Sequence, residues 1–149
     1  MDLNAYLRHS DKRYPRLSTD EEITLGRAVR KWQDWEGGPD EAPLAVVKAG
    51  RRAHERLVGS NLRFGYFIAR GFKGHGVPID DLLSAATEGL IQASLRYEPK
   101  TGNKFISYAV WWVKQQLQIQ VASQSMSMKL STTVFQKFYK ATRAEARLL

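Results

Sequence analysis

Apolar residues recur every three or four positions over long stretches of this chain, which is the spacing of one face of an α-helix. The clearest stretch follows Pro78, a residue that suits the first turn of a helix because its missing N–H has no intrahelical partner there. Its apolar positions are Ile79, Leu82, Leu83, Ala86, Leu90 and Ala93. No segment of useful length alternates apolar and polar residues as a β-strand does, so the sequence predicts an all-α fold.

Capping and turn residues divide the rest of the chain into further helices. We expect a short helix over residues 2–9, a second from a capping box at Ser18 and Glu21 to about residue 35, and a third over roughly 43–72, interrupted at Gly50 or near Gly59. Glu22 lies in the first turn of the second helix, where the helix dipole favours an acid. The apolar stripe of the third helix is Leu57, Leu62, Phe64, Phe67 and Ile68. Helices over roughly 103–123 and from residue 131 complete the set, giving a compact domain over 1–125 and a linker with a basic helix over 126–149.

The positive charge of the chain is concentrated in its last third. Net charge is +8, from 23 basic and 15 acidic residues, and residues 100–149 hold eight basic residues against one acid, which leaves +7 there. Such asymmetry is typical of a protein that binds a polyanion, but it also suits a solvated basic face that keeps a protein soluble. Charge alone leaves these two interpretations evenly matched.

Several classes of function find no support in the sequence. There is no cysteine and the three histidines show no ligand spacing, so we expect no metal and no cofactor. We also expect no enzymatic activity, because there is no nucleophile–base pair and the glycine-rich segment 71–76 lacks the Gly-Lys-Ser/Thr ending of a phosphate-binding loop. No apolar run approaches the roughly 20 residues that cross a membrane, and no signal peptide is apparent, so a cytoplasmic protein is expected.

Two stripes share the expected helix over 103–123. The apolar stripe suits the core and comprises Ile106, Ala109 or Val110, Val113, Leu117 and Val121. The second stripe comprises Lys104, Tyr108, Trp111, Gln115 and Gln118, and it cannot all be buried because the Lys and Gln groups would be unsatisfied. Rings can stack on unpaired bases at roughly 1–3 kcal/mol per base, glutamines can bond base edges, and lysines can meet phosphates. We favour a nucleic-acid surface over the alternative that the tryptophans are simply core aromatics.

Several blocks of this sequence resemble conserved region 2 of bacterial sigma-70-type sigma factors. They are Asn-Leu-Arg at residues 61–63, Asp-Asp-Leu-Leu at 80–83, Glu-Gly-Leu-Ile-Gln-Ala at 88–93, Tyr-Glu at 97–98, and Lys-Phe-Ile-Ser-Tyr-Ala-Val-Trp-Trp-Val-Lys-Gln at 104–115. Their spacing is kept without gaps from residue 61 to residue 115, and the Tyr-Ala-x-Trp-Trp block is highly specific. Residues 3–22 resemble region 1.2 and residues 128–137 resemble the start of region 3, so the resemblance covers almost the whole chain.

The resemblance implies a protein that recognises and melts a −10-like promoter element. One base of the non-template strand would be flipped into a pocket made by Tyr97, Glu98, Tyr108, Trp111 and Trp112. Gln115 and Gln118 would read the last paired base upstream, and Asn61 would help to hold a second flipped base downstream. The further expected DNA-binding residues are Arg63, Lys104, Phe105, Lys114, Lys129 and Lys137.

The resemblance also implies that the helix over 79–93 docks on the clamp of the largest subunit of core RNA polymerase. The expected contact residues are Asp80, Asp81, Leu82, Leu83, Ser84, Ala85 and Glu88. The chain departs from the family pattern at residues 84–86, where Ser-Ala-Ala replaces Gln-Glu-Gly and removes a polar contact. It departs again at Thr101 and Asn103, beside the flipped-base pocket, and at Ile119, where a basic residue is common and a phosphate contact is weakened.

The length of the chain favours one branch of the family. Members usually continue into a region 4 that reads the −35 element, whereas this sequence stops after the first helix of region 3, as late-gene sigma factors of tailed phages do. Those proteins resemble a minimal −10 reader that depends on a separate co-activator and a sliding clamp. The pair Leu148 and Leu149 is either a docking tail for such partners or part of ordinary helix packing. The alternative function is a sigma-fold regulator that occupies the clamp and blocks the host sigma factor, and the intact aromatic residues speak against it.

Overall fold

The computed structural model describes residues 2–126, 137 and 139–143, and within these ranges every regular element is helical. The α-helices are α1 (Leu3–Arg13), α2 (Thr19–Gln33), α3 (Leu44–Gly59), α4 (Leu62–Arg70), α5 (Ile79–Arg96) and α6 (Phe105–Met126). Two short 3-10 helices, η1 (Pro39–Glu41) and η2 (Pro99–Thr101), lie in the connections, and residues 139–143 are also helical. The prediction of an all-α fold is confirmed.

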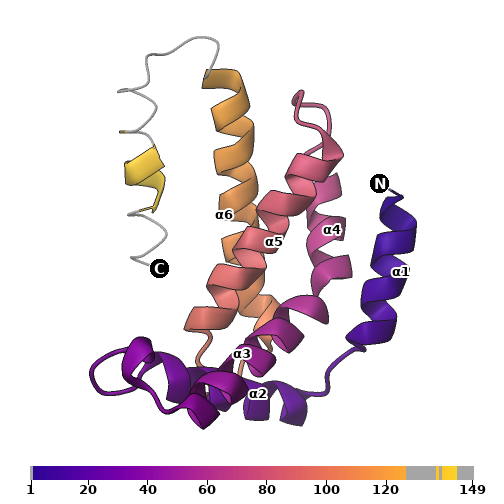
Figure 1. The fold of residues 1–149 in the computed structure, drawn as a ribbon. Coiled ribbons are helices and arrows are strands. Elements are labelled where there is room, and N and C mark those ends of the chain that lie inside the picture. Colours follow the sequence, from indigo (N-terminus) through magenta and orange to yellow (C-terminus); the bar gives the residue numbers. More distant parts are fainter. Residues whose placement is uncertain (1, 127–136, 138, 144–149) are drawn as a thin grey trace.

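Helix α5 lies at the centre of the bundle (Figure 1). It packs along α6 on one side and against α4 on the other, while α2 and α3 pack on each other and close the end where α5 finishes and α6 begins (Figure 1). Helix α1 stands at the edge of the bundle beside α4 (Figure 1). The first turns of α6, which begin the two-stripe segment, therefore lie in a corner built by the helices of the N-terminal half.

A glycine allows α5 and α6 to cross at close range. A Cβ at Gly89 would lie 2.5 Å from the Cα of Val113 and 2.9 Å from the carbonyl oxygen of Trp112, so no larger residue fits without moving backbone. Around this crossing the core is formed by side chains with almost no exposed area: Leu82, Ala86, Leu90, Ala93, Ala109, Val113 and Leu117. The core stripes that the spacing predicts for both helices are confirmed at these positions.

The end of α1 differs from the sequence prediction, whereas the division of the long third helix is found at one of its two predicted positions. Helix α1 continues to Arg13 instead of ending at residue 9, because Leu7 and Ser10 are both buried on its inner face. The long third helix is divided after Gly59, as one of the two alternatives predicted, and Gly50 lies buried within α3 without interrupting it. The Ser10 hydroxyl donates to the carbonyl oxygen of Gly59 at 3.4 Å, so α1 is attached to the bundle at this division.

Two phenylalanines predicted for the core lie on the surface instead. Phe64 is 43% exposed and Phe67 is 68% exposed. Helix α4 packs on α5 through the small residues Gly65 and Ala69, and an added Cβ at Gly65 would lie 3.1 Å from the Cδ1 of Leu90. Because the small residues make the contact, the bulky rings are turned away from α5, and the predicted stripe is wrong at these two positions.

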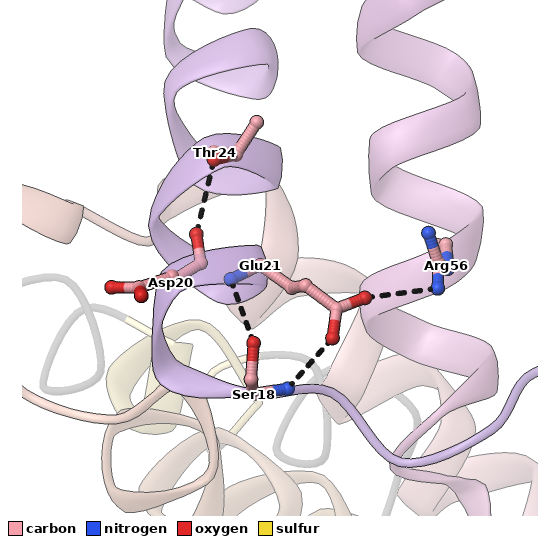
Figure 2. Close-up of polar contacts among 5 residues, drawn as sticks. All are labelled: Ser18, Asp20, Glu21, Thr24 and Arg56. Atoms are coloured by element: carbon pink, nitrogen blue, oxygen red, sulfur yellow. Dashed lines mark hydrogen bonds and ion pairs between the residues drawn. The ribbon is translucent and has the colours of Figure 1, made fainter.

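The capping box at the start of α2 is confirmed. The Glu21 N–H donates to the Ser18 hydroxyl and the Ser18 N–H donates to a Glu21 carboxylate oxygen, both at 3.2 Å (Figure 2). The second Glu21 oxygen accepts from Arg56 of α3 at 3.2 Å, so the same carboxylate joins the cap to the neighbouring helix (Figure 2). The bonds with Ser18, more than the Arg56 charge, lower the pKa of Glu21.

Two polar contacts tie down the C-terminal end of α5. Arg30 of α2 donates to the carbonyl oxygen of Leu95, and the Nδ1 atom of His54 in α3 contacts the hydroxyl of Ser94. That hydroxyl donates its one hydrogen to the carbonyl oxygen of Ile91 at 2.9 Å, so His54 must be the donor to Ser94. Burial of the imidazole lowers the pKa of His54, because it penalises the charged form.

Candidate nucleic-acid interface

Five aromatic rings form one connected cluster where α5 ends and α6 begins. The Tyr97 ring meets the Phe105 ring edge-on at 5.4 Å between centroids and lies 6.3 Å from Tyr108. Trp112 continues the cluster, with centroids 6.5 Å from Tyr108 and 5.3 Å from Trp111, both in edge-to-face geometry. Such contacts fix the rings relative to one another, because each edge rests on the electron-rich face of its neighbour.

Burial divides this cluster into a floor and a surface. Tyr97, Phe105 and Trp112 are 2%, 0% and 6% exposed, whereas Tyr108 and Trp111 are half-buried. Helical spacing alone did not reveal that Tyr97 and Phe105, both expected to touch DNA, are enclosed by protein in this conformation. They support the surface from beneath, and the ring area offered to a ligand belongs mainly to Tyr108 and Trp111.

The floor is held by polar contacts as well as by packing. The Tyr97 hydroxyl donates to the carbonyl oxygen of Asn103 at 2.6 Å, which ties the turn before α6 to the end of α5. Burial, and to a lesser extent the nearby Glu22 carboxylate, raises the pKa of Tyr97. The Arg96 guanidinium lies over the Trp112 ring with its Cζ 5.2 Å from the centroid, a cation–π contact at the last turn of α5. Arg96 was not among the residues that the sequence singled out.

A buried carboxylate positions the first residue of α6. Glu22 is 7% exposed, and its Oε2 accepts from the backbone N–H of Phe105 at 3.0 Å. The sequence placed Glu22 in the first turn of α2 only as a favourable charge for that helix. The available signal was its spacing, since Glu22 shares a helical face with the buried residues Gly26 and Val29. An acid on a buried face needs a partner, and here the partner is the N-terminus of another helix.

The polar residues of the row predicted to bind nucleic acid differ in how exposed they are. Lys104, just before α6, and Gln118 of α6 are exposed, as is Lys114, which is not part of that row. Gln115 is half-buried, and its Nε2 donates to the carbonyl oxygen of Thr142 at 3.1 Å, so the C-terminal segment already holds that side chain. Lys137 is exposed, and the predicted contact Lys129 lies outside the described residues. The Glu98 carboxylate accepts from the backbone N–H of Lys100 at 3.1 Å and so caps the start of η2. Glu98 directly follows Tyr97 of the aromatic cluster in the sequence.

A cavity of about 750 Å³ opens beside the start of α6, between α4 and the segment that joins α1 to α2. Asn61, Arg63 and Lys104, all predicted to bind DNA, line it together with Arg16 and Phe67. Asn61 donates to the carbonyl oxygen of Leu57 at 2.8 Å. Arg63 is held by an ion pair with Asp11 of α1, which raises the pKa of Arg63 and joins α1 to α4.

The predicted polymerase-binding residues divide by exposure. Asp80, Asp81, Ser84 and Glu88 lie on the outer side of α5, and Glu88 accepts from Gln92 at 3.1 Å. Leu82, Leu83 and Ala85 are 0%, 5% and 9% exposed, so the two leucines are core residues and cannot offer side chains to a partner in this conformation. Ile119 is 8% exposed, beside this part of α5, so its side chain does not lie on the exposed row of α6.

A family model for sigma-70 region 2 matches residues 57–125, which hold α4, α5, almost all of α6 and the whole aromatic cluster. The chain belongs to the family of sigma-70-type sigma factors. It is 32% identical over 148 residues to the RNA polymerase sigma factor RpoH of Caulobacter vibrioides. The matched stretch covers 98% of this chain and 44% of that protein. It is 28% identical over 140 residues to the RNA polymerase sigma factor SigA4 of Synechococcus elongatus. That match covers 91% of this chain and 45% of the relative. The chain thus spans less than half the length of these curated relatives.

Within residues 2–126, 137 and 139–143, no helix is long and apolar enough to cross a membrane. The same residues contain no group of three or more His, Cys, Asp or Glu side chains placed to hold a metal ion.

Proposed function

We propose that this protein is a sigma factor that binds core RNA polymerase and recognises and melts a −10-like promoter element. The observation that carries the proposal is the pair of half-buried rings, Tyr108 and Trp111, resting on a rigid aromatic floor inside the matched region 2. Exposed Lys114 on the same helix and Lys104 just before it flank these rings, so a surface for stacking lies beside charges for phosphates.

The rings would stabilise an unpaired base of the non-template strand. Unstacking a base costs a few kcal/mol, and stacking on protein rings at roughly 1–3 kcal/mol per base can offset most of it. Lys104 and Lys114 would neutralise phosphates on either side, and Gln118 would bond the edge of the last paired base. Gln115 can join it once its bond to Thr142 is released. Tyr97, Phe105, Trp112 and Glu98 would act mainly by fixing the position of this surface.

The cavity between α4 and the α1–α2 connection would receive a second unpaired base downstream. Its volume of about 750 Å³ is ample for a nucleobase, and Asn61 supplies hydrogen-bonding groups at its wall. Arg16 and Lys104 add positive charge that suits the phosphates of the same strand. The aromatic Phe67 offers a stacking face, which gives a role to a ring that packing alone does not explain.

The outer face of α5 would dock on the clamp of core polymerase through Asp80, Asp81, Ser84 and Glu88. A sigma factor acts where RNA polymerase acts, so the proposed site of action is the cytoplasm. A role in late phage transcription, with no −35 reading and with a separate co-activator and sliding clamp, stays a prediction from the resemblance.

The test uses purified core polymerase, this chain and a template with only a −10-like element that carries 2-aminopurine at position −11. We expect a fluorescence rise on opening and a transcript. Replacing Tyr108 and Trp111 by Ala should leave core binding intact and lower opening by roughly 5- to 150-fold for each ring, from the stacking energy of about 1–3 kcal/mol. Trp35→Ala, which removes a half-buried tryptophan at the end of α2, is the matched control and should open normally.

Two results contradict the proposal in different ways. Binding to core without any opening, with any co-activator supplied, would indicate a clamp-occupying regulator. Normal opening by the double variant would show that the stacking surface lies elsewhere.

A further inference from the structure

A hollow of about 300 Å³ lies between the outer face of α5 and the middle of α6. Asp81, Ser84 and Glu88 form its α5 side, and the small side chain of Ala85 lies at its base. Gln116 and Gln120 are on its α6 side, and the remaining wall is Tyr139 of the C-terminal segment. Tyr139 therefore brings the C-terminal segment (residues 137 and 139–143) to the face of α5 that carries the proposed polymerase contacts.

Polar contacts hold this segment in place. The carbonyl oxygen of Thr142 accepts from Gln115 at 3.1 Å, which fixes the segment along α6. Within the segment, Arg143 donates to the Tyr139 hydroxyl at 2.8 Å, and its Cζ lies 5.6 Å from the centre of the Tyr139 ring. The Tyr139 ring is thus oriented by a residue one helical turn away, which limits its freedom at the hollow.

Charge favours the same placement. The outer face of α5 carries the exposed acids Asp80, Asp81 and Glu88, whereas the segment carries the exposed bases Lys137 and Lys140. Opposite charges on two surfaces that face each other favour their association and orient it. The docked segment thus has an attractive field in addition to the contacts of Tyr139 and Thr142.

We propose that the hollow between α5 and α6 is a docking surface for the chain's own C-terminal segment, and that core polymerase competes with the segment for this face. The competition rests on the proposed function, because it requires that α5 docks on polymerase. If most molecules hold the segment on α5, the apparent dissociation constant for polymerase is raised by the reciprocal of the undocked fraction. Release of the segment would also free Gln115 for DNA, so one event would open both surfaces.

The first test compares the binding of core polymerase by the full chain and by Tyr139→Ala. Removing the ring weakens docking, so the variant should bind core about 3- to 10-fold more tightly. Tyr6→Ala, a change at a 39% exposed tyrosine on α1, is the matched control and should bind as the wild type does. Equal affinity for all three proteins would overturn the competition.

The second test measures docking directly and does not depend on affinity. The chain has no cysteine, so Gln118→Cys with Ala141→Cys introduces two unique sites, both exposed and neither on the proposed polymerase face. Electron–electron resonance between nitroxides at these sites should give a short, narrow distance distribution in the free protein. Saturation with core polymerase should lengthen and broaden it.

The outcomes separate the two proposals. A broad, long distribution in the free protein overturns the docking itself, and a short distribution that persists in the polymerase complex overturns the competition. If neither the wild type nor Tyr139→Ala binds core, the proposed function fails and the competition fails with it. In that case, a short distribution in the free protein would still show that the segment docks beside α6 at the hollow.

Discussion

The crossing of α5 and α6 at Gly89 gives the sharpest prediction about stability. Gly89→Ala adds one methyl group, which would stand 2.5 Å from the Cα of Val113, 2.8 Å from its nitrogen and 2.9 Å from the Trp112 carbonyl oxygen. Carbon atoms in contact normally lie about 3.5–4.0 Å apart, so the two helices must separate by about 1 Å. All three obstructing atoms are backbone, and no side-chain rotation can relieve the overlap.

The net effect is set by two opposing contributions. Overpacking of a core costs about 1–3 kcal/mol, and more where backbone must move. Ala favours a helix over Gly by about 1 kcal/mol, which offsets part of that loss. Because backbone must move, we expect the upper end of the overpacking cost, about 3 kcal/mol, and therefore a net destabilisation of about 2 kcal/mol, which for a chain of this size lowers the melting temperature by roughly 4–8 °C.

Urea and thermal unfolding, followed by circular dichroism, measure this loss. Gly65→Ala is the matched control, because the closest atom to its added methyl group would be the Cδ1 of Leu90 at 3.1 Å, the end of a flexible side chain, and its other neighbours lie at 3.7 Å or more. That variant should stay within about 1 kcal/mol of the wild type, since the helix preference of Ala offsets a small adjustment. If Gly89→Ala were as stable as the wild type, the close approach of the two helices would be wrong.

Three further predictions concern the surroundings of the aromatic cluster. Glu22→Ala should cost about 1–3 kcal/mol in urea unfolding, because it leaves the buried N–H at the start of α6 without its acceptor, and Glu22→Gln should cost less. Trp112→Ala should lower the unfolding free energy by about 3–5 kcal/mol, because the ring is buried. Trp111→Ala should lower the unfolding free energy much less than Trp112→Ala does, but it should reduce promoter opening more. Urea unfolding and the 2-aminopurine assay on both variants check this difference. Since burial lowers the pKa of His54 below 6.5, the unfolded state binds more protons below that pH, and unfolding free energy should fall as pH drops from 6.5. His54→Gln should flatten this dependence of unfolding free energy on pH, and His75→Gln, a change at an exposed histidine, should not. An unchanged slope in His54→Gln, or an equal loss of slope in His75→Gln, would contradict the role given to His54.

Helical periodicity predicted most of the fold and the main row of the site. The stripe from Ile79 to Ala93 placed α5 correctly because its apolar residues are the ones that pack. Lys104, Tyr108, Trp111 and Gln118 retain surface area, as their spacing on one face of α6 predicts. These features are local, so sequence spacing is enough to specify them.

The features that spacing did not predict depend on contacts between distant segments. Phe64 and Phe67 looked like core residues, but the close approach of small residues decided which face of α4 packs. Glu22 looked like a surface acid until α6 supplied its partner. The enclosure of Tyr97 likewise requires Gly26 of α2, because a Cβ added at Gly26 would lie only 3.1 Å from the Tyr97 ring. In each case the deciding atom belongs to another helix.

The bond from Glu22 to Phe105 joins residues 83 positions apart, and one of them lies outside the segment 57–125 that the family model matches. A fragment cut to that segment would lose the acceptor for the first N–H of α6 and the α2 backbone that lies against Tyr97. The segment that the family model matches therefore does not contain all the contacts that hold the start of α6. During synthesis, α2 emerges from the ribosome well before α6, and the aromatic floor cannot be completed until α6 has been made and has closed the long loop back to it.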